Sequence, residues 1–86
     1  MQEITGKPNI EYPTDWKYKV IGLENLILRD AIDEVLEEKD YSLRFSNKSK
    51  KGKFISLEVS LIVENEKERD SIFFNLKNHS AVKMVI

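Results

Sequence analysis

The chain has 86 residues, a formal net charge of −1, no cysteine and one histidine. Its length and its 41% hydrophobic and 34% charged residues fit one globular domain with a single small core. The absence of cysteine excludes a disulfide framework, a zinc–thiolate site, an iron–sulfur cluster and a thiol nucleophile. The near-neutral charge argues against a global attraction to nucleic acid or membrane.

Residues 1–11 are polar and have no hydrophobic period, so we expect a flexible N-terminal arm before one domain over residues 12–86. The arm has no apolar run of the kind found in secretory signals. No apolar stretch approaches the roughly 18–20 residues that a membrane span needs. Together with the missing cysteines, this favours a cytoplasmic protein with no membrane contact.

The first predicted elements are a strand and a helix. Residues 16–21 alternate between two faces, which is typical of a half-buried strand. The apolar face of this strand consists of Trp16, Tyr18 and Val20. Gly22 ends the strand, and Asn25 is expected to cap the following helix. Over residues 26–38 apolar residues recur at helical spacing among acidic ones, which predicts an amphipathic helix.

Two further strands are predicted in the middle of the chain. Residues 41–46 alternate between apolar and polar side chains, and a polar, glycine-containing connection follows over residues 47–53. Residues 55–63 show the clearest two-residue period in the sequence. Because their apolar face is long and unbroken, we expect this third strand to lie in the centre of a sheet.

The last part of the chain predicts one more helix and one more strand. Asn65 and Glu68 have the spacing of a capping box, so a helix is expected to begin there and to end near Asn78. Its inner stripe consists of Ile72, Phe73 and Leu76. Residues 82–86 alternate again and predict a strand. The side chains of this strand that are expected to face the core are Val82, Met84 and Ile86.

This order of elements is the order of the ferredoxin-like split sandwich. Two right-handed crossovers joined by a hairpin give an α+β fold of the βαββαβ type, with a four-stranded antiparallel sheet in the order 4-1-3-2. Both helices are expected on one face of the sheet. The other face is then open to solvent or to a partner.

Basic and acidic residues are segregated along the chain despite its small net charge. Residues 41–53 carry a net charge of +5, and residues 24–40 carry −5. The basic hairpin and the open sheet face form a candidate surface for a partner or for nucleic acid: Lys17, Lys19, Arg44, Lys48, Lys50, Lys51, Lys53 and Phe54. Hairpin lysines also protect an edge strand, so a purely solvated role stays open. The shortage of outward aromatic residues argues against RNA binding by base stacking.

The turn between the first strand and the first helix is a second candidate site, made of Gly22, Leu23, Glu24 and Asn25. It exposes the N-terminus of a helix, whose backbone N–H groups can receive a carboxylate or another anion. The alternative is that Gly22 only permits a tight turn.

The sequence contains no recognisable catalytic, metal or cofactor set. His79 stands near the end of the second predicted helix without a nucleophile and an orienting acid. The carboxylates of the first helix lack the pattern of a calcium loop, and three glycines cannot build a phosphate-binding loop. We therefore expect no enzymatic activity, no metal and no cofactor.

Three segments, in this order, resemble the YbeD-like family of small uncharacterised bacterial proteins. They are residues 12–22 (Tyr-Pro-Thr-Asp-Trp-Lys-Tyr-Lys-Val-Ile-Gly), residues 49–57 (Ser-Lys-Lys-Gly-Lys-Phe-Ile-Ser-Leu) and residues 82–86 (Val-Lys-Met-Val-Ile). The resemblance implies a ferredoxin-like fold similar to ACT-type regulatory domains, which bind small molecules such as amino acids. ACT domains place such ligands near the turn that corresponds to residues 22–25. The Asp-x-Pro-Gly run typical of their ligand loops is absent.

The leading hypothesis is a non-enzymatic regulatory or protein-interaction module that acts as a homodimer or on an unidentified partner. Two alternatives stay open. One is a sensor of an amino acid or another carboxylate at the turn of residues 22–25. The other is a weak nucleic-acid binder that uses the basic hairpin and the open sheet face.

Overall fold

A computed structural model of the chain describes residues 10–48 and 53–86. Its elements, in chain order, are β1 (Thr14–Gly22), α1 (Asn25–Leu36), β2 (Ser42–Lys48), β3 (Ile55–Val63), α2 (Glu66–Lys77) and β4 (Met84–Val85). The expected arm falls almost entirely on residues 1–9, which lie outside the described residues. None of the helices in the described ranges is long and apolar enough to cross a membrane.

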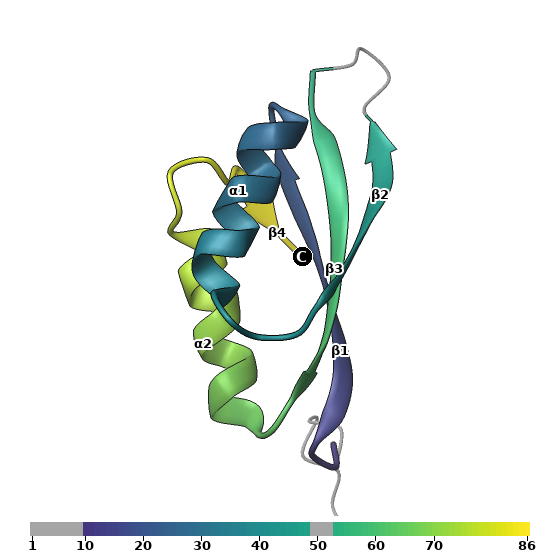
Figure 1. Cartoon of the computed structure of the whole chain (residues 1–86), viewed down its shortest axis with the longest axis vertical. Coiled ribbons are helices and arrows are strands. Elements are labelled where there is room, and N and C mark those ends of the chain that lie inside the picture. The colour runs from purple at the N-terminus through teal and green to yellow at the C-terminus, as the bar shows by residue number, and fades with distance from the viewer. Residues whose placement is uncertain (1–9, 49–52) are drawn as a thin grey trace, which may run out of the picture.

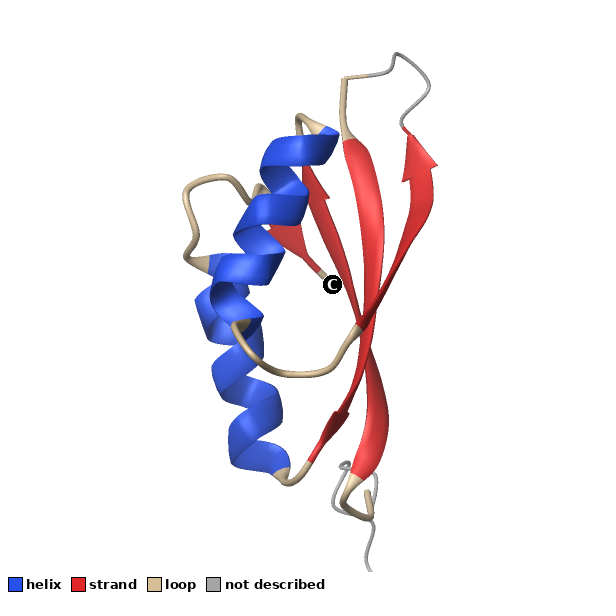
Figure 2. Cartoon of the chain, in the orientation of Figure 1, coloured by secondary structure: helices blue, strands red, loops and turns tan. Residues whose placement is uncertain are grey.

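The strands form one antiparallel sheet in the order β2-β3-β1-β4, which is the predicted order counted from the other edge. Both helices lie on one face of this sheet, and its other face is bare (Figures 1 and 2). The predicted βαββαβ fold is therefore confirmed. The third strand lies in the centre of the sheet, between β2 and β1, as its long apolar face predicted.

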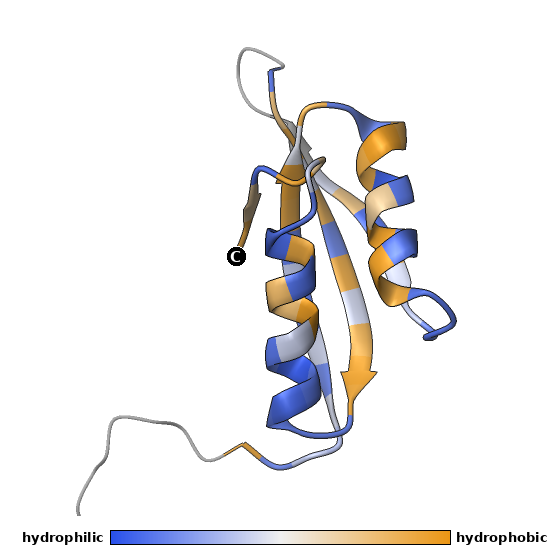
Figure 3. Ribbon diagram, turned by 90° about the vertical axis from the view of Figure 1, so that its left-hand side faces the viewer, coloured by the Kyte–Doolittle hydropathy of each residue, from blue (hydrophilic) through white to orange (hydrophobic). Residues whose placement is uncertain are grey.

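The core lies between the sheet and the two helices. Alternate residues of β1 and β3 point into it, because successive side chains of a strand point to opposite faces. Helix α1 contributes one stripe of apolar residues, and the hydropathy colours of Figure 3 show how both helices alternate hydrophobic and hydrophilic bands. The largest fully buried side chains are Val20, Leu28, Ile32, Leu36, Leu57, Val59, Val63 and Leu76.

The two edges of β1 are paired to different extents. On one edge β3 pairs with all of β1, from Thr14 opposite Val63 to Gly22 opposite Ile55. On the other edge β4 pairs only near the C-terminal end of β1. Ile86 adds the last contact, because it exchanges two backbone hydrogen bonds with Lys19, of 2.9 and 3.1 Å.

Two predictions about side-chain positions in the last strand are wrong. Met84 and Ile86 are 55% and 68% exposed, whereas Val85 packs against the core. The reason is the register with β1, since directly opposite residues share a face. Val85 lies opposite the buried Val20, and Met84 lies opposite Ile21 on the bare face.

The helix starts were predicted with unequal success. Asn65 caps α2 and accepts a 2.8 Å hydrogen bond from the backbone N–H of Glu68, as the capping-box spacing indicated. Asn25 does not cap α1: the N-cap is Glu24, whose side chain makes no cap hydrogen bond. Asn25 is already helical, and its Oδ1 accepts a hydrogen bond from Arg29 instead.

Candidate functional site

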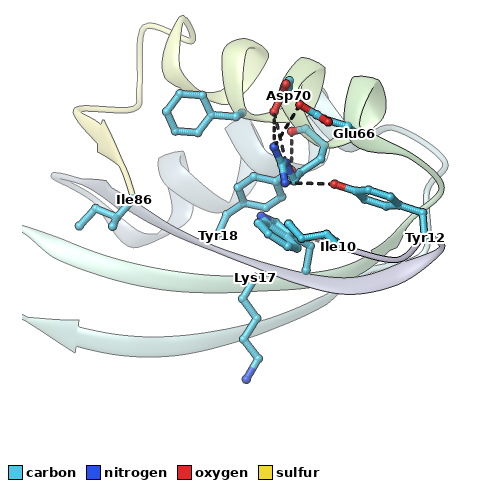
Figure 4. Close-up of a pocket in the computed structure, with 10 residues that line it drawn as sticks. Ile10, Tyr12, Lys17, Tyr18, Glu66, Asp70 and Ile86 are labelled. Atoms are coloured by element: carbon cyan, nitrogen blue, oxygen red, sulfur yellow. Dashed lines mark hydrogen bonds and ion pairs between the residues drawn. The ribbon is translucent and has the colours of Figure 1, made fainter. Parts of the chain in front are cut away.

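A pocket of about 610 Å³ lies between the N-terminal half of β1 and the flank of α2 (Figure 4). We call it the β1–α2 pocket. Its volume falls within the 300–1,000 Å³ range that is usual for binding pockets. The residues that line it are Ile10, Tyr12, Trp16, Lys17, Tyr18, Glu66, Arg69, Asp70, Phe73 and Ile86.

Arg69 is the central side chain of the β1–α2 pocket. Its guanidinium lies over the Trp16 ring, 4.8 Å from the ring centroid, and its Nη1 donates a 3.0 Å hydrogen bond to the hydroxyl of Tyr12. Its Nε and Nη2 lie 3.2 Å from Oδ1 of Asp70, and Glu66 lies 3.8 Å away. A cation over an aromatic face is attracted by the ring quadrupole. Arg69 therefore joins α2 to β1 and to the turn that precedes β1.

Tyr18 fixes the backbone of Arg69. Its hydroxyl donates a 2.7 Å hydrogen bond to the main-chain carbonyl of Arg69, and the residue is buried. Burial raises the pKa of Tyr18 to about 12, because the charged phenolate is poorly solvated there. The phenol therefore stays a neutral hydrogen-bond donor throughout the physiological pH range.

The rim of the pocket carries opposite charges at short range. Glu66 and Asp70 are exposed, whereas the side chain of Arg69 is only 20% exposed. Burial disfavours the charged guanidinium, but the hydrogen bond to Asp70 and the surrounding charges outweigh it, so the pKa of Arg69 is raised. The pocket thus has aromatic walls, a permanently charged cation and an acidic rim.

Among the described residues, no strand lies beside the outer edge of β1 next to this pocket. Lys19 exchanges hydrogen bonds with Ile86 on this edge, and Ile21 accepts one from Lys83. Because backbone groups alternate between the two edges of a strand, the N–H and C=O groups of Asp15 and Lys17 point to the same edge. Nothing in the ranges 10–48 and 53–86 pairs with them there. We call residues 14–18 the free edge of β1.

The predicted site at the turn of residues 22–25 is placed next to a different, smaller pocket. Leu23 and Glu24 line a space of about 190 Å³ together with Ile27, Ser80, Ala81 and Lys83. A side chain on Gly22 would meet Leu28 Cδ1 at 2.8 Å and the carbonyl oxygen of Ala81 at 3.0 Å. Close packing therefore accounts for the glycine without a ligand.

Three residues of the predicted basic surface, Lys17, Lys19 and Arg44, lie around Glu58 on the bare face of the sheet. Arg44 forms an ion pair with Glu58 across the strands and lowers the pKa of that carboxyl. Lys53 lies over the ring of Phe54, and Lys17 and Lys19 are exposed on the bare sheet face. Lys50 and Lys51 lie outside the described residues, as does the side chain of Lys48. This surface stays a prediction.

His79 has structural partners. Its Nε2 lies 2.5 Å from a carboxylate oxygen of Glu34, and its Nδ1 accepts a 3.0 Å hydrogen bond from the backbone N–H of Ala81. These contacts join α1 to the connection between α2 and β4. Among residues 10–48 and 53–86, no three His, Asp or Glu side chains gather as metal ligands do.

Sequence reasoning did not predict the β1–α2 pocket. Trp16 and Tyr18 were expected in the core, and only Tyr18 is fully buried. The usable signal was Arg69, which lies three residues before Ile72 and therefore on the inner stripe of α2. A charged residue on an apolar stripe needs partners, and the nearest aromatic strand supplies them.

Comparison with known proteins gives the same fold and a family without an assigned function. The model of a family described as "Protein of unknown function (DUF493)" matches residues 7–86. An uncharacterised protein of Helicobacter pylori is 42% identical over 77 residues, which cover 85% of each chain. A UPF0250 protein of Hahella chejuensis is 34% identical over 83 residues, covering 92% of this chain and 91% of the relative.

Solved structures support the architecture. The solution structure of a Helicobacter pylori protein superposes with a TM-score of 0.80 at 33% identity, covering 100% of this chain and 94% of the other. The ACT domain of a GTP pyrophosphokinase from Chlorobium tepidum superposes with a TM-score of 0.59 at 18% identity, covering 85% and 97%. The second likeness shows the fold alone.

Proposed function

Since the chain belongs to the DUF493 family, whose members have no assigned function, we propose that it is a non-enzymatic protein-interaction module that docks a partner at the β1–α2 pocket. The observation that carries this proposal is the free edge of β1 beside an aromatic pocket. An unpaired strand edge is a template for another strand, and natural proteins usually cover or blunt it.

The chemistry of the pocket favours docking over catalysis. Tyr18 is held neutral, with its pKa raised to about 12, so it is a poor proton acceptor at neutral pH. Arg69 already binds Tyr12 and Asp70 and lies over Trp16. Such a cluster of rigid aromatic residues with one arginine is the composition that is enriched at the centres of protein interfaces.

The strand edge and the pocket complement each other as a docking surface. An added strand would satisfy the outward N–H and C=O groups of Asp15 and Lys17. Its alternate side chains would then point toward Trp16 and the flank of α2. Main-chain hydrogen bonds would supply affinity, and the pocket would supply selectivity.

Site-specific photo-crosslinking tests this proposal. The chain offers a matched pair, because Phe73 lines the pocket at 37% exposure and its neighbour Phe74 is 63% exposed outside it. Each is replaced in turn by benzoylphenylalanine, and the protein is irradiated in cells of the organism that supplies the gene. We expect a discrete adduct at position 73 and none at position 74. Equal labelling at both positions, or none at position 73, would contradict a docking role.

A second candidate function is the sensing of a small carboxylate at the turn of residues 22–25. It is supported by the neighbouring small pocket, by Lys83 on its wall and by the lack of a side-chain cap on α1. The volume of about 190 Å³ is below the usual range for ligand sites, which places this candidate second. A thermal-shift series with amino acids, matched with the Lys83→Ala variant, tests it: no stabilisation by any of them removes the candidate.

A further inference from the structure

We propose that the partner at the free edge of β1 is a second copy of the chain, which pairs antiparallel with it about a two-fold axis at Trp16. This inference rests on the proposed function and names its partner. The joined strands would connect two four-stranded sheets edge to edge. The helices of both copies would then lie on the same side.

The length and the polarity of the free edge allow few symmetric registers. Pairing centred on Lys17 would require the outward backbone groups of Lys19, which Ile86 already occupies. Pairing centred on Asp15 would set Lys17 against Pro13, which has no N–H to donate. Pairing centred on Trp16 sets Asp15 of one copy against Lys17 of the other, and every outward group of these residues finds a partner.

The charges of the free edge are complementary in this register alone. Asp15 and Lys17 are exposed on the bare face of the sheet, and neither forms an ion pair with another described residue. About the axis at Trp16, each Asp15 lies directly opposite a Lys17 of the second copy. In the other two registers Lys17 meets Lys17, or Asp15 meets Asp15, and like charges directly opposite are destabilising.

The other face of the joined strands also fits a second copy. Trp16 would lie opposite Trp16, beside Arg69 and Phe73, so the β1–α2 pockets of the two copies would be covered together. Aromatic pairs are favourable at such non-hydrogen-bonded positions. The flank of α2 carries Glu66 toward its N-terminus and Lys77 at its end. Two antiparallel copies of this flank bring opposite charges toward each other.

Charge-swap variants test the register. Asp15→Lys and Lys17→Asp each place like charges opposite one another at both ends of the symmetric contact. We expect each variant alone to dimerise at least about tenfold more weakly than the unmodified chain in sedimentation analysis. The double variant restores both contacts and should dimerise again. An equimolar mixture of the two single variants should form a mixed dimer, because their charges complement each other.

Controls and contrary outcomes separate this inference from the proposed function. Lys83→Asp and Asp30→Lys make the same charge changes at exposed positions away from the free edge and should leave dimerisation unchanged. Circular dichroism checks that every variant is folded. Single variants that dimerise normally, or a mixture that stays monomeric, overturn the register. A crosslink at position 73 to another protein, with a monomeric chain, overturns the second copy but leaves the docking role standing. The absence of any crosslink at position 73 contradicts both the second copy and the docking role.

Discussion

The two ends of strand β1 have different surroundings. At the Gly22 end β1 is paired on both edges, and Leu28 and Ala81 leave no room for even a methyl group on Gly22. At the Trp16 end β3 is the one strand of the described ranges that pairs with β1, and the outer edge faces a pocket. Close packing fills the space at the closed end, whereas at the open end no described residue pairs with the outward backbone groups of Asp15 and Lys17.

The difference shows why a likeness of fold does not by itself locate a site. The turn of residues 22–25 is where the resemblance to ACT-type domains predicted a ligand, but its glycine is explained by close packing. The opposite end of the same strand combines aromatic walls and complementary charges with backbone groups that no described residue pairs with. Substitutions at the two ends should either remove this difference or measure it more finely.

The largest effect is expected at the closed end. Gly22→Ala places a Cβ 2.8 Å from Leu28 Cδ1 and 3.0 Å from the carbonyl oxygen of Ala81. Leu28 is fully buried, and Ala81 packs against the core. Overpacking of this kind costs about 1–3 kcal/mol of unfolding free energy. Urea denaturation measures it. An unchanged unfolding free energy would show that the closed end accommodates a methyl group without strain.

A smaller loss is expected at the open end when its central cation is removed. Arg69→Leu abolishes the contact with Trp16 and the hydrogen bond to Tyr12, at a cost of about 1–2 kcal/mol. The fluorescence of Trp16, the single tryptophan, should change with it. Lys67→Leu removes a positive charge from an exposed position of the same helix and should change neither property. Equal effects of the two variants would contradict the role of Arg69.

The two helix starts should respond differently to the same substitution. Asn65→Ala removes the cap of α2 and should cost about 1 kcal/mol, within the usual range for lost caps. Asn25→Ala removes one exposed hydrogen bond to Arg29 and should cost about 0.5 kcal/mol or less. Thermal denaturation of both variants measures the difference. A larger loss for Asn25→Ala would restore the predicted cap.

The last prediction concerns the ionisation of Tyr18, which changes the stability of the fold only in alkali. The folded pKa of Tyr18, about 12, lies above its ordinary value of 10.0, so folding favours the neutral phenol. Its contribution is therefore complete below pH 10 and is lost as the pH rises toward 12. The pKa of Tyr41 is also raised, by burial and by its hydrogen bond with Asp33, so the comparison is made in a Tyr41→Phe background. There the tyrosinate absorbance of the folded chain should contain one late titration, which Tyr18→Phe removes. A late titration that persists in Tyr18→Phe in this background would assign it to another tyrosine.

The order of the elements was predictable because apolar residues recur with different periods in strands and in helices. The strand at residues 55–63 and the cap at Asn65 are local patterns and were predicted correctly. The orientation of Met84 and Ile86 was not predictable in this way. It follows from the register between β4 and β1, which is set by contacts between distant residues.

The β1–α2 pocket escaped prediction for the same physical reason. Its parts stand more than fifty residues apart, and Tyr12, Trp16 and Arg69 meet only when α2 packs on the sheet. Aromatic residues at strand spacing predict core positions, and Tyr18 does lie in the core. Whether the edge of a strand stays open depends on where the neighbouring strand ends. No local pattern in β1 predicts that position.

Amide hydrogen exchange at Lys17, compared with Lys19, tests whether this edge is open for docking. The amide of Lys19 donates to Ile86 and should be protected at every protein concentration. The amide of Lys17 should exchange freely in dilute solution and become protected as the concentration rises and a second copy pairs with it. Protection of Lys17 equal to that of Lys19 in the most dilute sample would show that the edge is already covered, and would contradict docking at this edge.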